Sequence, residues 1–80
     1  DLYNQTLLYP NPAKEYITIS FENNTLSFEE IQIIDLHGKL VKKIPFIERV
    51  FVGDLSEGIY FVKINSKTNT VIKKIVISNK

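Results

Sequence analysis

Apolar and polar residues alternate with a period of two along most of this chain, and no segment repeats convincingly at the helical period of 3.6. In "YITISF", for example, Ile17, Ile19 and Phe21 alternate with Thr18 and Ser20. This alternation is typical of strands that bury one face and leave the other in water. The chain is therefore expected to be all-β.

Seven segments carry the strand pattern, and turn signals separate them at the spacing of a sandwich. We therefore predict a β-sandwich of about seven strands. The predicted strands are a short one around Leu7 and Leu8, then "YITISF", "IQI", "KLVKKI", "RVFV", "GIYFVKI" and "TVIKKIVI".

Two turns have recognisable chemistry. In "DLHG", Asp35 can accept from backbone amides two residues on, and Gly38 can supply the positive φ of a tight hairpin. In "DLSEG", Asp54 and Gly58 are expected to act in the same way, with Leu55 turned into the core.

The strands differ in how much of each is expected to be covered. Both faces of "GIYFVKI" begin apolar, which predicts a central strand covered on both sides. Lysines interrupt both faces of "TVIKKIVI", which predicts an edge strand. We expect the one long polar loop, "ENNTLSFEE", to be anchored by Leu26 or Phe28.

The first long strand is preceded by a proline pair in "LYPNPAKEYITISF". Pro10 and Pro12 each fix φ and remove a backbone donor. The segment from Tyr9 to Pro12 is therefore expected to be rigid, extended or turn-like, and unable to pair as a central strand.

Composition narrows the class of protein. Eighty residues with 44% hydrophobic and 24% charged side chains describe one globular domain. No cysteine is available for a disulfide or for thiolate chemistry. The longest apolar run, Ile59 to Val62, is too short for direct membrane insertion. Because the chain opens on Asp1 with no signal sequence, we expect it to be a fragment of a longer precursor.

No arrangement of residues predicts catalysis, a cofactor or a metal site. His37 is the only histidine, and adjacent strand positions turn Glu29 and Glu30 to opposite faces. Phosphate loops, nucleophile elbows and zinc spacings do not occur. Nucleic-acid binding is also not expected, because aromatic rings do not alternate with basic residues on one face. We therefore predict a protein that is not an enzyme.

The last third of the chain is basic, with five lysines and no acidic residue from Gly58 onward. These lysines either keep a strand face soluble or meet an anionic partner. Under the second interpretation, Lys63, Lys73 and Lys74 cluster near one sheet edge, where a partner protein can add a strand.

Four pieces of sequence, in order, resemble one family. They are "YPNPAKEYITI", "IQIIDLHGKLV", "VGDLSEGIYFVKI" and the closing "KKIVISNK". Together they resemble the C-terminal sorting domain of the type IX secretion system, type A (the Por secretion tail family of Bacteroidota). The matched motif positions are Tyr9, Pro10, Asn11, Pro12, Asp35, Gly38, Lys39, Leu55, Gly58, Tyr60, Val62 and Lys74.

The resemblance implies an immunoglobulin-like antiparallel β-sandwich that sorts its cargo and does no chemistry. Residues 1–8 become the end of an upstream linker with a possible short first strand, and residues 9–80 the sorting domain. The implied partners are the cargo domain covalently upstream, the type IX translocon and a sortase-like peptidase that removes the tag. Our own hypothesis, from the charge of the last third of the chain, is that the translocon faces Lys63, Lys73 and Lys74. The implied route is export through the periplasm to the cell surface or the medium.

An adhesion or carbohydrate-binding module of a secreted protein is the alternative. Such modules stack exposed aromatic rings against sugar rings. The candidate rings in this chain are Tyr3, Tyr16, Phe46 and Phe61.

Overall fold

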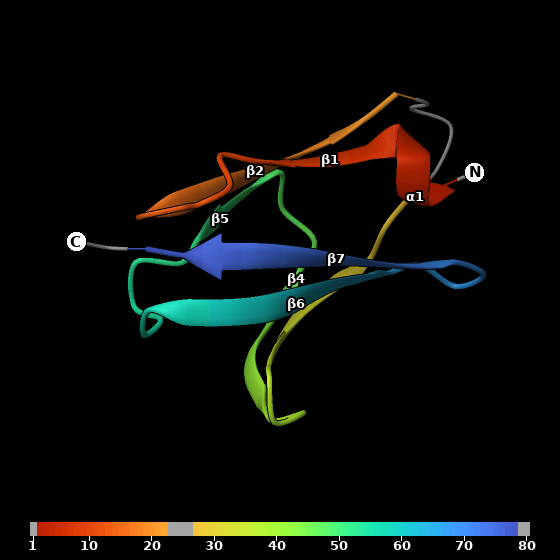
Figure 1. The fold of residues 1–80 in the computed structure, drawn as a ribbon. Helices are drawn as coiled ribbons and strands as arrows, with labels where there is room; N and C mark the ends of the chain where they lie inside the picture. The colour runs from red at the N-terminus through yellow and green to blue at the C-terminus, as the bar shows by residue number, and fades with distance from the viewer. Residues whose placement is uncertain (1, 23–26, 79–80) are drawn as a thin grey trace.

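Seven strands in two antiparallel sheets dominate residues 2–22 and 27–78, the part of the chain that the computed structural model describes (Figure 1). The predicted strands are all present, and one helical turn, which the periodicity did not predict, precedes them. The elements are α1 (Leu2–Gln5), β1 (Thr6–Tyr9), β2 (Tyr16–Phe21), β3 (Glu30–Asp35), β4 (Leu40–Pro45), β5 (Arg49–Phe51), β6 (Gly58–Asn65) and β7 (Thr70–Ile77).

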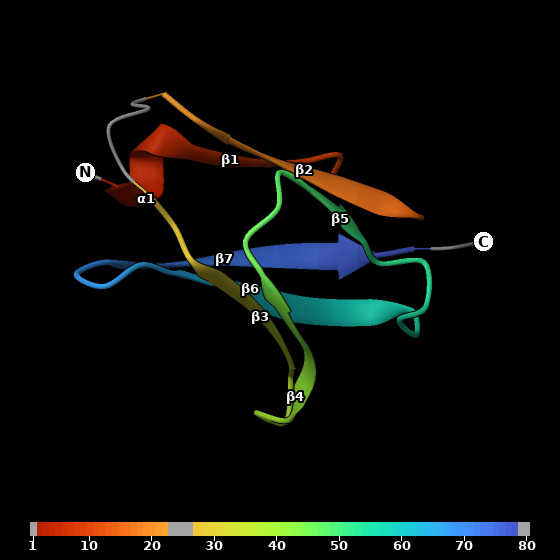
Figure 2. The ribbon, with the colours of Figure 1, turned by 180° about the vertical axis from the view of Figure 1, so that it is seen from behind.

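The strands form a three-stranded sheet in the order β1-β2-β5 and a four-stranded sheet in the order β4-β3-β6-β7. All neighbours in each sheet pair antiparallel. Figure 2 shows the chain crossing from β4 in one sheet to β5 in the other. This arrangement confirms the immunoglobulin-like sandwich.

The core is one apolar layer between the sheets, because every second residue of the long strands turns inward. Burial of these side chains supplies most of the stabilisation of a two-layer domain. The buried apolar residues are Ala13, Ile17, Ile19, Ile31, Ile33, Val50, Val52, Leu55, Tyr60, Val62, Ile64, Val71, Ile75 and Ile77.

Strand β6 is central in its sheet, since it pairs with both β3 and β7, but it is covered on one face only. Tyr60, Val62 and Ile64 are buried, whereas Ile59 on the other face is 37% exposed. The prediction of cover on both sides was therefore wrong, because a sandwich of two sheets has no third layer to lie over β6. Strand β7 lies at the sheet edge, as predicted.

Phe28 anchors the long loop between β2 and β3. Its ring stacks on Phe21 with centroids 4.6 Å apart, and Phe46 lies 6.1 Å from each of them. The three rings close one end of the sandwich against the core. Leu26, the other proposed anchor, falls outside the described residues.

Candidate functional site

The segment between β1 and β2 is fastened to the edge of β7 by the side chain of Asn11. Its Oδ1 accepts a hydrogen bond from the backbone N–H of Val76 at 3.0 Å. Its Nδ2 donates to the carbonyl oxygen of Lys74 at 3.4 Å. The Asn11 amide thus offers an acceptor and a donor to a strand edge, as the backbone of a paired strand would.

Ala13 continues this attachment with its backbone. Its N–H donates to the Val76 carbonyl oxygen, and its own carbonyl accepts from Ser78 N–H, each at 2.8 Å. Together these bonds form a parallel bridge between Ala13 and Ile77, and the Ala13 side chain is fully buried. We call residues 10–13 the strap.

The strap bends instead of running straight, and both of its prolines follow cis peptide bonds. Neither proline has an N–H to offer β7. The Asn11 side chain and the Ala13 backbone therefore make the contacts that the prolines cannot. These contacts give the motif "YPNP" a structural role in joining the N-terminal region to the last strand.

The motif positions Asp35, Gly38 and Lys39 form the hairpin between β3 and β4. Asp35 Oδ1 accepts from the backbone N–H groups of His37 and Lys39 at 2.8 and 2.9 Å. Gly38 has φ of +83°, so the predicted turn chemistry is confirmed. The N–H of Lys39, helped by that of His37, holds the pKa of Asp35 below its ordinary value.

The motif positions Leu55, Gly58, Tyr60 and Val62 run from the β5–β6 connection into β6. Leu55, Tyr60 and Val62 are buried. The Tyr60 hydroxyl donates to the carbonyl oxygen of Ser56 at 2.6 Å, a contact like the tyrosine corner of immunoglobulin-like sandwiches. Gly58 has φ of +153°, which confirms the expected positive φ before Tyr60.

The three lysines proposed to meet a partner lie on two faces of the four-stranded sheet. Lys63 and Lys74 are at alternating positions that place them on the outer face, opposite Ile72 and Phe61 of the paired strand. Lys73 pairs with Val62 and lies on the inner face, next to the edge. Lys73 and Lys74 thus both lie on the edge strand β7, with their side chains on opposite faces of the sheet, whereas Lys63 lies on the inner strand β6.

Lys42 makes contacts between the two sheets that the sequence pattern did not predict. From β4 its Nζ donates to Asp54 Oδ1 at 2.8 Å and to the Phe51 carbonyl oxygen at 2.7 Å. It also lies 5.5 Å from the centre of the Phe51 ring. These contacts tie the edge of one sheet to the end of β5 in the other, and the Lys42 side chain holds the pKa of Asp54 below its ordinary value.

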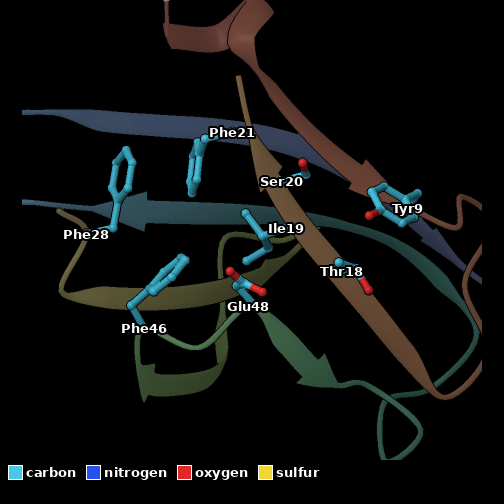
Figure 3. A pocket seen from close by; sticks show the side chains of 8 residues that line it. All are labelled: Tyr9, Thr18, Ile19, Ser20, Phe21, Phe28, Phe46 and Glu48. Atoms are coloured by element: carbon cyan, nitrogen blue, oxygen red, sulfur yellow. The ribbon is translucent and has the colours of Figure 1, made fainter. Parts of the chain in front are cut away.

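A cleft of about 400 Å³ opens beside β2, where β5 begins (Figure 3). The rings of Phe21, Phe28 and Phe46 stand at one end and Tyr9 at the other, with Glu48 and Thr18 between them. Within the described residues no group of three His, Cys, Asp or Glu side chains lies where it could hold a metal ion. The cleft offers a wall of three aromatic rings, the Glu48 carboxylate and the Tyr9 phenol.

The rings proposed for sugar stacking are placed differently from one another. Phe46 packs against Phe21 and Phe28 and is partly buried. The guanidinium of Arg49 lies 4.1 Å from the Tyr16 ring centre and covers one of its faces. Phe61 is half-buried on the outer face of β6, and the Tyr3 side chain falls outside the described residues. Tyr16, Phe46 and Phe61 therefore do not form one flat surface on which a sugar could stack.

In the part of the chain that the structure describes, no helix has both the length and the apolar character needed to cross a membrane. The single described helix, α1, has four residues.

The comparison with known families agrees with this architecture. A family model described as the secretion system C-terminal sorting domain matches residues 7–78, from β1 to the residue after β7. No curated protein matches the chain. Because the family match covers both sheets, the strap and all the motif positions, the chain belongs to the C-terminal sorting domains of the type IX secretion system.

Proposed function

We propose that the type IX translocon in the outer membrane recognises this domain in its folded form, and that a sortase-like cysteine peptidase then removes it from its cargo. Membership in the family makes the chain a secretion tag for an attached cargo and not a catalytic domain. The tag directs export across the outer membrane to the cell surface or the medium. Passage through the periplasm is part of the proposal.

The observation that carries the proposal is the extent of the family match, residues 7–78. A signal read as a linear peptide needs only a short segment, whereas this match spans seven strands. The motif positions also serve the fold: Asn11 fastens the strap, Asp35 shapes a hairpin and Tyr60 holds the β5–β6 connection. These roles support recognition of an assembled surface.

The structure limits where the proposed peptidase can act. Peptidases of this kind need an accessible backbone, and the backbone from Thr6 onward is paired in β1, with the Thr6 side chain fully buried. We therefore place the cut before Thr6, in the upstream linker or in the first residues of the segment 1–8. The division into the end of an upstream linker with a short first strand (1–8) and a sorting domain (9–80) belongs to the same proposal.

The test is an export assay. Residues 1–80 are fused behind a fluorescent protein that carries a signal peptide, in a strain with a working type IX system. Fluorescence in the medium and on the cell surface is compared with that in a strain without the translocon. Export that needs the translocon is expected, and mass spectrometry of the released reporter locates the cut.

A Val62→Asp variant, which buries a charge in the core, controls for folding. It should remain in the cell. Export of the unfolded variant would show that a linear segment suffices, and retention of the folded wild-type tag would refute the sorting function.

A further inference from the structure

The strap covers only the last part of the β7 edge. In an antiparallel sheet alternate residues of an edge strand point both backbone groups away from the sheet. In β7 these are Thr70, Ile72, Lys74 and Val76, because Val76 bonds to the strap through both its groups. Lys74 bonds to the strap through its carbonyl oxygen alone. The Lys74 N–H and both backbone groups of Ile72 bond to no described residue, so this stretch is an open strand edge.

A groove runs beside this open edge, between β7 and β1. It has a volume of about 270 Å³ and is lined by Thr6, Leu7, Leu8, Asn11, Lys73 and Lys74. Figure 1 shows β1 and β7 passing each other along this side of the sandwich. Leu7 is 59% exposed, and Asn11 lies at the end of the groove where the strap begins.

The two lysines flank the open edge from opposite faces. Lys74 lies on the outer face of the sheet and Lys73 on the inner face, toward β1. In a strand, adjacent residues also point to opposite faces. A strand added to β7 would therefore offer two consecutive side chains to the two lysines, one to each.

We propose that this groove binds an extended segment of a partner protein, which adds to β7 as a further strand beside Ile72 and Lys74 and carries two consecutive acidic residues. One carboxylate faces Lys73 and the other faces Lys74. The strap shows that this edge accepts an added segment, since Ala13 already forms a parallel bridge to it. That the partner belongs to the secretion apparatus rests on the proposed function, whereas the groove and its acidic ligand do not.

A second copy of the chain does not fit this edge. Pairing of two β7 edges about a twofold axis at the open stretch would bring Lys73 and Lys74 of one copy close to the same lysines of the other. Like charges facing each other across a strand pair are destabilising. From Gly58 onward the sequence also holds no acidic residue that could offset them.

The first test uses the purified 80-residue chain and a synthetic probe, the peptide Thr-Val-Thr-Glu-Glu-Val-Thr-Val. A matched peptide has two lysines in place of the two glutamates. Amide chemical shifts and hydrogen exchange are followed by NMR. We expect the glutamate peptide, but not the lysine peptide, to shift the amide signals of Ile72 and Lys74 and to slow their hydrogen exchange. The effect should be weaker at 1 M salt, where the Debye length is about 3 Å.

Two variants separate the backbone contribution from the charge. Ile72→Pro removes an N–H that points away from β6 and so leaves the β6 ladder intact, whereas Ile72→Thr keeps the N–H. We expect binding of the peptide to be lost in the first and kept in the second. Lys74→Glu should weaken binding by about tenfold. Lys67→Glu, in the exposed β6–β7 hairpin, is the matched control and should bind as the wild type does.

The second test places Lys74→Glu, Ile72→Pro, Lys67→Glu and Phe61→Ser, a change on the outer face of β6, in the export assay, with melting temperatures measured for each. Only the first two should lower export. If Ile72→Pro does not fold, the proposal is tested by the export of Lys74→Glu and by the protection of the Ile72 and Lys74 amides in the wild type. Absence of peptide protection at Ile72 and Lys74, or loss of export with Phe61→Ser but not with Lys74→Glu, would overturn the proposal. Failure of the wild-type tag to be exported would instead refute the sorting function and leave the peptide test to judge the groove.

Discussion

The side-chain oxygen of Asn11 accepts a hydrogen bond from the backbone N–H of Val76 at 3.0 Å. The two residues are 65 positions apart, and the bond joins the segment before the first long strand to the end of the last one. The bond from the Asn11 side-chain nitrogen to the Lys74 carbonyl oxygen joins the same two regions of the chain. One amide thus holds the entry of the domain to its final strand.

Replacing Asn11 with alanine should lower the free energy of unfolding by about 1 kcal/mol, the net value of a typical hydrogen bond. It should also accelerate hydrogen exchange at the Val76 amide, while the amide of Ile75, which belongs to the other side of the strand, keeps its protection. Urea unfolding and NMR exchange measure the two effects. Asn11→Asp is the matched control, since it keeps the acceptor for Val76 and replaces the donor to Lys74 with a carboxylate oxygen. Equal exchange at Val76 in wild type and Asn11→Ala would contradict the role of the strap.

Gly58→Val should destabilise the domain by about 1–3 kcal/mol, because φ of +153° is strained for a β-branched residue. Space is not the cause, since a Cβ at this position would meet no atom within 4 Å. For a domain of this size, each kcal/mol lowers the melting temperature by about 4–8 °C, which calorimetry resolves.

Gly53→Ala should also destabilise the domain, but for a steric reason, because the added Cβ would come within 2.8 Å of the Phe51 ring. Truncating that ring in the double variant Gly53→Ala/Phe51→Ala should relieve the steric part of the cost. No truncation of a neighbour should rescue Gly58→Val. A melting temperature unchanged by Gly58→Val would show that the turn tolerates a side chain.

Lys42→Ala should cost about 1 kcal/mol of stability, through loss of the charged hydrogen bonds to Phe51 and Asp54. The loss is small because the Asp54 side chain is 54% exposed and water screens its interaction with Lys42. Lys43→Ala, whose Nζ lies 3.6 Å from Glu30 on an exposed surface, is the neighbouring control and should change stability by less than about 0.5 kcal/mol. Equal effects from the two variants would refute the role of Lys42 as a link between the sheets.

Acid should weaken the domain in a way that depends on Asp35 and Asp54. The pKa of each carboxyl lies below its ordinary value of 3.8 in the folded state. The stabilising contribution is therefore complete above pH 3.8 and is lost as the pH falls through the lower folded pKa values. Urea midpoints measured from pH 7 down to about pH 2.5 should therefore decrease below pH 3.8.

The double variant Asp35→Asn/Asp54→Asn removes both titrations while leaving oxygen acceptors in place. Its stability should decline less steeply with acid than that of the wild type. An identical decline in both proteins would assign the acid sensitivity to other carboxylates.

The strands were predictable because their information is local. Period-two alternation sets which residues of β2 and β7 turn inward. Gly38 marks the turn between β3 and β4, and Gly58 marks the end of the connection between β5 and β6. The buried positions of Ile17, Ile75 and Val62 follow directly from that alternation.

The contacts of Lys42 and of Asn11 were not predictable from local pattern. The register of β3 and β4 shifts between Ile33 and Ile34, so that Ile34 pairs with Leu40 and Val41 is the extra residue. A bulge of this kind reverses which side chains turn inward beyond it. The Asn11 bond depends on the packing of two ends that are far apart in sequence, which no short window contains. For the same reason the sequence predicted that Lys73 and Lys74 lie near an edge, but not that an uncovered groove separates that edge from β1.

The single apolar layer between the sheets also governs how the domain can come apart. Neither sheet has a second buried face, so a departing sheet would leave the whole inner surface of the other in water. Partly opened forms are therefore much less favourable than either end state, and unfolding is expected to be all-or-none. The domain then presents its strand edges, groove and hairpins together or not at all. Any receptor for its surface consequently acts as a folding sensor, one that passes over a chain whose sandwich has not yet assembled.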